Sequence, residues 1–343
     1  MKTSIQQALD LLGEQQPLPP NMMRTVMHQI MDGKATDAQI GGLLMALKLQ
    51  GETTQYITEA AEVMRERAIK VEIDDTNLID TCGTGGDGKS LFNVSTASAF
   101  IAAAAGCKVA KHGNRSVSSS TGSADVLEAA GIHLDLSPEQ VKTCIENCGI
   151  GFLFAPAHHG ATRYAVGPRK ELAVRTMFNL LGPLTNPANT PYQVMGIYAA
   201  EWMLKVAEVL KQLGAKHVMV VHSTDGMDEI SLAAPTHVVE LKNGSISEYT
   251  IQPEDFAIAS QSMDELVVKN ANQSFDIIEA ALTGQSGPAA DILALNAGAA
   301  IYVAQKAPTL AEGIVKAREI LNNGAAYKVL QQLKTQTQDM RHD

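Results

Sequence analysis

The hydrophobic pattern of the first 72 residues is that of amphipathic helices. Apolar residues recur at helical spacing, which predicts helices at residues 3–12, 21–31, 37–49 and 54–68. The third is the clearest, because Thr36 and Gln39 form a T-x-x-Q capping box. The apolar residues that follow make one stripe: Ile40, Leu43, Leu44 and Leu47. This part of the chain is therefore predicted to be a small helical bundle.

The pattern changes near residue 72. Short apolar runs now alternate with helical patterns that begin near Ser95, Gly122, Ser137 and Glu201. The apolar runs are NLID (77–80), KVAKHG (108–113), GFLFAP (151–156), QVMGIY (193–198) and HVMVVH (217–222). Such alternation predicts βαβ units around a largely parallel sheet. Residues 236–251 break the rhythm, because two β-type runs flank Asn243-Gly244 and predict a hairpin.

The chain returns to a helical pattern from Phe275 to Leu333. Between Gly167 and Pro191 it combines helical stretches with Gly-Pro and Asn-Pro breaks, which is typical of a crossing between domains. We therefore predict an α/β protein with a small N-terminal α-helical domain and a larger α/β domain with a mainly parallel central sheet. The helical domain would span 1–72, with 168–190 crossing back to it, and the α/β domain would span 73–167 and 191–343.

Composition excludes several classes of protein. The 343 residues are 45% hydrophobic and 19% charged, as in ordinary globular proteins, and a length of this kind suggests two domains. The longest apolar run, 97–106, is too short to span a membrane. Asp10 and Glu14 interrupt the N-terminal segment where a secretion signal needs apolar residues, so we expect a cytoplasmic protein. The formal net charge of −10 argues against a nucleic-acid partner. The four cysteines lack zinc-type spacing and are expected to be buried thiols.

Residues 80–96, DTCGTGGDGKSLFNVST, match the P-loop pattern G-x-x-x-x-G-K-[ST] from Gly83 to Ser90. In a true P-loop the Lys-Ser pair opens a helix, whereas the better helix start here is Asn93 or Ser95. The strand at 217–222 also ends in a histidine, where a P-loop enzyme needs an aspartate for magnesium. We therefore interpret the P-loop match as accidental. A glycine-rich loop that can surround an anion remains.

A second loop, KHGNRSVSSSTGSADVLEAAG (111–131), follows the next predicted strand with cations and hydroxyls. Adjacent parallel strands place both loops at the same edge of the sheet, which suggests a ligand with two anionic groups. The segment HSTDGMDEIS (222–231) brings Asp225, Asp228 and Glu229 to that edge as well. These carboxylates are either a solvated turn or, beside a polyphosphate, a site for Mg²⁺.

These segments, with NLLGPLTNPAN and DGMDEIS, resemble the signature segments of the anthranilate phosphoribosyltransferases. Order and spacing agree over essentially the whole chain, including GGLLMALKLQGET in the helical part. The resemblance implies a fold like that of nucleoside phosphorylases and phosphoribosyltransferases, with the active site between the domains. It implies transfer of phosphoribose from 5-phosphoribosyl 1-diphosphate to the amine of anthranilate, with release of pyrophosphate, in tryptophan biosynthesis. Mg²⁺ is the implied cofactor and a homodimer the implied assembly.

The resemblance also implies site residues by matched position. Those around the diphosphate substrate are Gly83, Gly86, Asp87, Asn93, Val94, Ser95, Thr96, Lys111, His112, Gly113, Asn114, Arg115, Ser116, Val117, Ser118, Ser119 and Ser123. Those near anthranilate are Gly83, Asn114 and Arg169, and those associated with the metal are Ser95, Asp228 and Glu229. Leu91 departs from the family pattern, which usually has Thr or Ser there. Either Ser90 replaces the lost hydroxyl or the phosphate is held less tightly.

The chemistry of the residues agrees with this reading. Negative charge gathers on the leaving pyrophosphate and the ribosyl carbon becomes oxocarbenium-like, so positioning and charge stabilisation dominate. An aromatic amine is unprotonated at neutral pH, so no general base is assigned, although His112 and His159 invite a test. Arg169 lies in a basic helical stretch with Arg163, Lys170 and Arg175, and a guanidinium can bind a carboxylate in a bidentate fork.

Three alternatives differ in class from this reading. A pyrimidine nucleoside phosphorylase has a similar architecture and cleaves a ribosyl bond with phosphate, but GNRSVSS and NLLGPLTNPAN are not expected in it. A P-loop NTPase is disfavoured as described above. A non-catalytic relative that binds a phosphometabolite or nucleic acid stays open, because related folds can lose activity.

Overall fold

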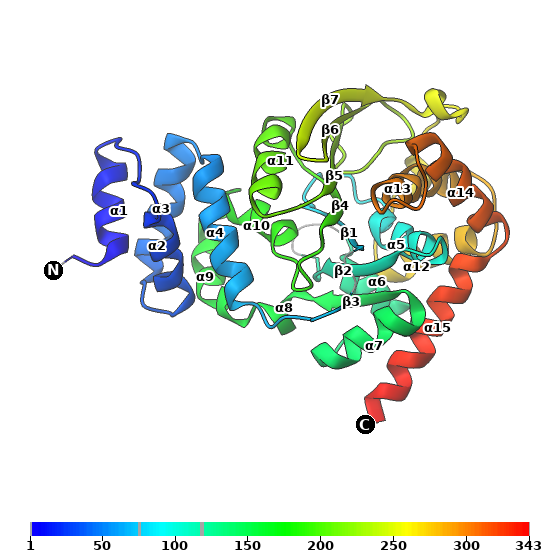
Figure 1. Ribbon diagram of the computed structural model, residues 1–343, viewed down its shortest axis with the longest axis horizontal. Coiled ribbons are helices and arrows are strands. Elements are labelled where there is room, and N and C mark those ends of the chain that lie inside the picture. The colour runs from blue at the N-terminus through cyan, green and yellow to red at the C-terminus, as the bar shows by residue number, and fades with distance from the viewer. Residues whose placement is uncertain (1, 75–76, 117–119, 343) are drawn as a thin grey trace.

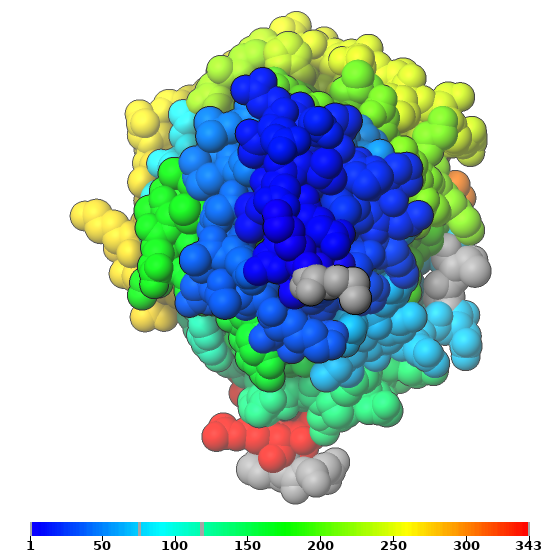
Figure 2. All heavy atoms as spheres, turned by 90° about the vertical axis from the view of Figure 1, so that its left-hand side faces the viewer, coloured from blue at the N-terminus to red at the C-terminus, as the bar shows by residue number. Residues whose placement is uncertain are grey.

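The computed structural model describes residues 2–74, 77–116 and 120–342. A helical bundle forms one end of the molecule, as Figures 1 and 2 show. Its N-terminal helices are α1 (Ser4–Gly13), α2 (Met22–Met31), α3 (Asp37–Gln50) and α4 (Thr54–Arg67). Two helices from the middle of the chain, α9 (Arg163–Leu172) and α10 (Phe178–Leu184), pack against α3 and α4. The capping box of α3 is present, since Thr36 Oγ1 accepts a hydrogen bond from the Gln39 amide at 3.3 Å.

A seven-stranded sheet forms the centre of the rest, in the order β3-β2-β1-β4-β5-β6-β7. The strands are β1 (Leu78–Gly83), β2 (Lys108–Gly113), β3 (Ile150–Phe154), β4 (Tyr192–Gly196), β5 (His217–Ser223), β6 (Thr236–Lys242) and β7 (Ser245–Ile251). The first five strands of this order, from β3 through β2, β1 and β4 to β5, are parallel. Strand β6 is antiparallel to β5, and β7 is antiparallel to β6. The chain leaves β1 toward β2 and later returns to its other side as β4. Ligands of open α/β sheets bind at such a reversal, beyond the carboxyl ends of the strands.

The remaining helices surround this sheet (Figure 1). They are α5 (Val94–Ala104), α6 (Ser123–Ala129), α7 (Pro138–Cys148), α8 (Ala155–His158), α11 (Met203–Gln212), α12 (Ala271–Leu282), α13 (Pro288–Val303), α14 (Leu310–Asn322) and α15 (Ala325–Asp339). Short 3₁₀ turns occupy 160–162, 200–202, 253–256, 264–266 and 340–342. Among the described residues, every helix is too short or too polar to cross a membrane.

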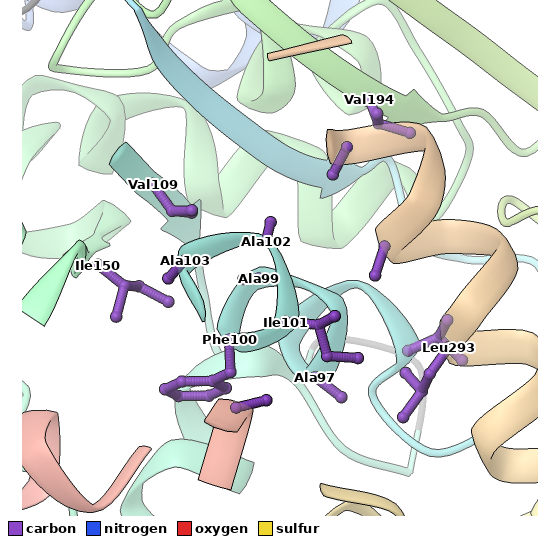
Figure 3. Packing of buried hydrophobic residues seen from close by; sticks show 14 of the residues in the cluster. Ala97, Ala99, Phe100, Ile101, Ala102, Ala103, Val109, Ile150, Val194 and Leu293 are labelled. Atoms are coloured by element: carbon purple, nitrogen blue, oxygen red, sulfur yellow. The ribbon is translucent and has the colours of Figure 1, made fainter. Parts of the chain in front are cut away.

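Each face of the sheet has its own hydrophobic core. Successive strand side chains point to opposite faces, so Val218 and Val220 of β5 join the core shared with the helical bundle, and Met219 and Val221 join the other. Helix α5 fills the second core. Its alanines allow close approach to the sheet and to α13. Figure 3 shows Ile101 beside Leu293 of α13 and Phe100 on the side of Ile150 of β3. This packing fixes the N-terminus of α5 at the carboxyl edge of β1.

The predicted fold class is confirmed, with a small N-terminal helical part and a mostly parallel sheet. The β2 segment and the hairpin match their predicted ranges, and all four cysteines are buried. The prediction that the Gly-Pro pairs break helices was wrong, because α9 runs through Pro168 and α10 through Pro183. A proline removes only its own N–H donor, and α10 ends one residue after it. Arg175 lies after α9 rather than within a helix. The domain boundaries at 72, 167 and 191 stay a prediction.

Candidate functional site

The loop after β1 approaches the segment that carries Asp228 more closely than side chains would allow. A Cβ atom at Gly83 would lie 2.6 Å from Asp228 Oδ2, and one at Gly196, the last residue of β4, would lie 1.5 Å from the Asp228 carbonyl oxygen. The amide of Gly85 donates a hydrogen bond to Asp228 Oδ2 at 2.7 Å. Glycine at these two strand ends therefore lets the carboxylate enter the loop.

Asp228 and Glu229 form a carboxylate pair at this edge. Asp228 is buried, and the backbone of Ser95 in the first turn of α5 hydrogen-bonds the Glu229 carboxylate. Burial is the main cause that raises the pKa of both groups, and repulsion between carboxylates, including Asp87, adds to it. The structure thus brings together the three predicted metal-associated residues and places two mutually repelling carboxylates among them.

This donor set fits Mg²⁺. No cluster of three or more His, Cys, Asp or Glu side chains suited to a metal occurs within 2–74, 77–116 and 120–342. Mg²⁺ differs from zinc in using one or two carboxylates, with substrate oxygens and water as further ligands. Asp228 and Glu229 satisfy that requirement, and a cation would offset the repulsion that raises their pKa values.

Lys111, near the end of β2, contributes a buried positive charge to this region. Its side chain is only 2% exposed, and Nζ donates a hydrogen bond to the Thr81 carbonyl oxygen. Its positive charge lowers the pKa of Glu229 against the larger effect of burial. Lys111 therefore supplies a buried positive charge close enough to act on the Glu229 carboxylate.

The predicted residues of the first loop lie where β1 passes into α5. Gly86 and Asp87 are in the loop, and the Asp87 carboxylate accepts a hydrogen bond from the Lys89 amide at 3.1 Å. Asn93 precedes the helix, and its side chain accepts a hydrogen bond from Ser274 Oγ at 2.7 Å. Val94, Ser95 and Thr96 form the first turn of α5. The buried Thr96 Oγ1 has no hydrogen-bond partner among the described residues.

The second loop continues from β2 through Gly113 to Ser123, the first residue of α6. Ser123 Oγ donates to the Asn114 carbonyl oxygen at 3.2 Å, and Asp125 accepts from the Ser116 amide at 3.0 Å. These bonds hold Asn114 and Ser116 against the first turn of α6. The predicted residues Val117, Ser118 and Ser119 lie outside the described residues.

Arg115 is engaged within the same loop. Its guanidinium binds both carboxylate oxygens of Glu128, at 2.5 and 2.6 Å, and lies over the ring of Phe154 at 5.5 Å. These contacts stabilise the loop. Any contribution of Arg115 to binding an anion would require it to share or exchange these partners.

Two buried histidines meet beside the second loop. The rings of His112 and His159 are 5.2 Å apart, and the ring of each bonds a backbone carbonyl, of Gly182 and Thr185 respectively. Burial lowers the pKa of His112 well below its usual value and that of His159 to about 4. Both rings are therefore neutral at pH 7 and donate through one nitrogen. The Nε2 atom of each is left as a buried acceptor without a partner in the described part of the chain.

Arg169 lies on α9 with its guanidinium 5.4 Å from the centre of the Phe178 ring. Burial lowers its pKa, and no carboxylate pairs with it among the described residues. It remains positively charged at neutral pH and could accept an incoming carboxylate. No hydrogen bond or ion pair among those residues links it to Gly83 or Asn114, so the grouping of these three around anthranilate stays a prediction.

Sequence reasoning missed the role of Arg175. Its guanidinium donates to the Gly86 carbonyl oxygen and lies 4.3 Å from the centre of the Tyr198 ring. Arg175 thereby ties the segment after α9 to the first loop. The basic stretch around Arg169 was visible in the sequence, but nothing in it could select which arginine reaches a loop 89 positions away.

The geometry of the first loop differs from that of a P-loop. Helix α5 begins at Val94, four residues after Ser90, whose φ of +52° is left-handed. Lys89 and Ser90 therefore do not present a helix N-terminus to a phosphate. Leu91 instead forms a bridge with Val267 and packs against the larger core, so its departure from the family pattern adds an apolar contact.

Comparisons with known proteins identify the family of the chain. Models of the glycosyl transferase family match the helical bundle domain at residues 6–68 and the a/b domain at 75–327. An anthranilate phosphoribosyltransferase from a Marinomonas species is 58% identical over 97% of each chain. The chain belongs to the anthranilate phosphoribosyltransferase family. A second relative with that name, from Thioalkalivibrio sulfidiphilus, is 56% identical over 96% of this chain and 97% of its own.

Solved structures of the family have the same fold. The anthranilate phosphoribosyltransferase of Thermus thermophilus superposes with a TM-score of 0.91 at 41% identity, over 96% of this chain and 99% of that one. The enzyme of Saccharomyces cerevisiae, described in complex with PRPP and Mg, superposes with a TM-score of 0.90 at 23% identity, over 99% of both chains. At that identity the second likeness shows the fold alone.

Proposed function

We infer that this protein is an enzyme that transfers the phosphoribosyl group of 5-phosphoribosyl 1-diphosphate to the amine of anthranilate. The products are N-(5-phosphoribosyl)anthranilate and pyrophosphate, and the reaction belongs to tryptophan biosynthesis. The observation that carries this conclusion is the full-length relationship to the anthranilate phosphoribosyltransferases, up to 58% identity among the relatives compared. The carboxylate pair, Lys111 and the two loops at one sheet edge supply the chemistry that the reaction needs.

We propose that the diphosphate substrate binds across the carboxyl ends of β1 and β2. The backbone around Gly83 and Gly86, the first turn of α5 and the loop from Lys111 to Ser123 would contact its anionic oxygens. Bare backbone amides at a helix start favour such anions. Lys111 adds a positive charge that interacts more strongly with departing pyrophosphate than with the intact substrate, which lowers the barrier.

We propose Mg²⁺ as the cofactor, held by Asp228 and Glu229 beside Ser95. When bound, it would neutralise charge on the pyrophosphate. This assignment rests on the fit of the carboxylates of this chain, since the complex with Mg belongs to the yeast protein.

We propose that anthranilate binds near Arg169, Asn114 and Gly83, with its carboxylate toward the Arg169 guanidinium. No general base is assigned, because the amine is already unprotonated at neutral pH. The neutral rings of His112 and His159 carry acceptor nitrogens that suit an amine donor, but their lowered pKa values make them poor proton acceptors at pH 7.

Two further properties of the family are proposals for this chain. A homodimer and a cytoplasmic location are expected from the sequence, and sedimentation of the purified protein would test the first. Among the site residues that the structure describes, none favours a nucleoside phosphorylase or a binding protein without activity.

Anthranilate fluorescence tests the proposed function. Mixing the protein with anthranilate, 5-phosphoribosyl 1-diphosphate and Mg²⁺ should make the fluorescence decay at a rate proportional to enzyme concentration. Omitting the diphosphate substrate should stop the decay. Unchanged fluorescence in the complete mixture, with folded protein, would contradict the proposal.

A further inference from the structure

A fully buried carboxylate lies directly behind the site, three residues before Gly83. Asp80 is a central residue of β1 and has no exposed surface. Its Oδ1 accepts a hydrogen bond from the His112 amide at 3.1 Å, and its Oδ2 accepts one from Asn186 Nδ2 at 2.8 Å. Asp80 cannot touch a substrate, so any part in catalysis must act through its neighbours.

Asn186 joins three segments of the chain. It follows α10 in the crossing segment and is 2% exposed. Besides its bond to Asp80, its Nδ2 donates to the Ala110 carbonyl oxygen of β2 at 2.8 Å. Its Oδ1 accepts from the Ala188 amide at 2.8 Å. Both N–H groups of the amide and its oxygen therefore bond to neighbouring segments, and they hold β1, β2 and the crossing segment together.

The same crossing segment also holds the two histidines beside the site. The Gly182 carbonyl oxygen binds the ring of His112, and the Thr185 carbonyl oxygen binds the ring of His159. The backbone of His112 is bound by Asp80 and its ring by Gly182, so this residue is fixed from both sides.

We propose that Asp80 and Asn186 are positioning residues that set the end of β2, and with it Lys111 and His112, against the crossing segment that leads from Arg169. This proposal rests on the proposed function. The two substrates bind on opposite sides of this junction, one at the β1 and β2 loops and the other toward α9. The pair therefore determines the distance between the ribosyl carbon and the amine.

The cost of the arrangement argues for such a role. Burying a carboxylate carries a large desolvation penalty, and replacing a buried polar pair by apolar residues of similar volume often leaves the free energy of unfolding unchanged or raises it. Burial raises the pKa of Asp80, and the charge of Lys111 is the largest opposing effect. The polar pair instead fixes the orientation of the segments that it joins, because hydrogen bonds restrict orientation more narrowly than apolar contacts do.

Asp80→Asn provides the test. The variant keeps the shape of the side chain and the oxygen that accepts from the His112 amide. Its new NH₂ group, however, faces the Nδ2 donor of Asn186, so the hydrogen bond between the two residues is lost. We expect kcat to fall at least about tenfold, because misplacement by about 1 Å costs on the order of a hundredfold. Both KM values should stay within roughly threefold of the wild type, since the substrate contacts themselves are retained.

Thr337→Val is the matched control. Thr337 is 1% exposed and also accepts a hydrogen bond from a distant amide, that of His133 at 3.1 Å, but it lies on α15 away from the site. It should lower the melting temperature while leaving kcat within about twofold of the wild type. A second variant, Asn186→Ser, removes the bond to Asp80 from the other side and applies if Asp80→Asn does not fold.

The reciprocal double variant Asp80→Asn/Asn186→Asp restores a donor–acceptor pair between the two positions. It leaves the Ala110 carbonyl oxygen facing a carboxylate, so rescue of kcat should be partial. The proposal is overturned if Asp80→Asn, or Asn186→Ser in its place, behaves like Thr337→Val, with lower stability and unchanged kcat. Loss confined to the KM values would overturn it as well. Failure of the proposed function would differ, since the wild type itself would then be inactive.

Discussion

Gly83→Ala should disable the enzyme through a single methyl group. The added Cβ atom would lie 2.6 Å from Asp228 Oδ2 and 3.3 Å from its Cγ, whereas ordinary contacts begin near 3.4 Å. The carboxylate must therefore shift by roughly 0.8 Å, which disturbs the hydrogen bond that its Oδ2 now accepts from the Gly85 amide. A hydrogen bond to a charged group contributes about 1.5–3 kcal/mol, and a shift of about 1 Å in a reacting group costs on the order of a hundredfold in rate.

The assay is anthranilate consumption at saturating substrates, titrated with Mg²⁺. We expect Gly83→Ala to lose on the order of a hundredfold in kcat and to require more Mg²⁺ for half-maximal rate. Gly41→Ala on α3 is the matched control, because a Cβ atom there would meet nothing within 4 Å. It should leave activity unchanged and, in a helix, favour stability slightly. A folded Gly83→Ala enzyme with normal turnover and normal Mg²⁺ dependence would refute the placement of Asp228 against this loop.

Three further predictions concern charged groups. Asp228→Asn/Glu229→Gln should nearly abolish turnover at every Mg²⁺ concentration. The melting temperature without metal should be unchanged or higher, because burial and repulsion oppose the two negative charges. Unchanged turnover would contradict the metal assignment. Arg169→Ala should raise the KM for anthranilate roughly ten- to a hundredfold, and Arg169→Lys should recover only part, so an effect mainly on the diphosphate substrate would contradict its role. Burial lowers the pKa of His159 to about 4, so on acidification this residue takes up a proton in the unfolded chain before it does so in the folded one. Its contribution to the free energy of unfolding is therefore complete above about pH 6.5 and is lost as the pH falls toward 4. Chemical denaturation at pH 7 and pH 4 should show that His159→Asn loses less stability than the wild type, by up to about 3 kcal/mol; equal losses would contradict the lowered pKa.

Local signals in the sequence predict much of this fold. The β6–β7 turn is predicted because Asn243-Gly244 between two β-type runs favours a tight hairpin turn. In the structure both residues adopt the positive φ that such a turn requires, +52° and +77°. The αβ alternation predicts the parallel sheet and places both loops at one edge. The resemblance supplies the site residues. In the structure Ser95 and Asp228 interact with Glu229, and the metal role of the three stays a prediction.

Long-range contacts could not be predicted in this way. The sequence around Asn186 predicts only a turn before a proline. No local pattern predicts its hydrogen bond to Asp80, which lies 106 positions earlier. The sequence pattern predicts helix breaks at Pro168 and Pro183, but α9 and α10 continue through these residues. The packing of the two helices on the bundle outweighs the local free-energy penalty of proline in a helix. Strand order and side-chain partners depend on the whole fold, which periodicity does not encode.

The stoichiometry of the reaction tests the central conclusion most directly. Pyrophosphate release and anthranilate consumption should be measured together in the wild-type enzyme with 5-phosphoribosyl 1-diphosphate and Mg²⁺. The account predicts one pyrophosphate for each anthranilate consumed, and no pyrophosphate when anthranilate is omitted. Pyrophosphate release that is independent of anthranilate, or an absence of both signals with folded protein, would contradict it.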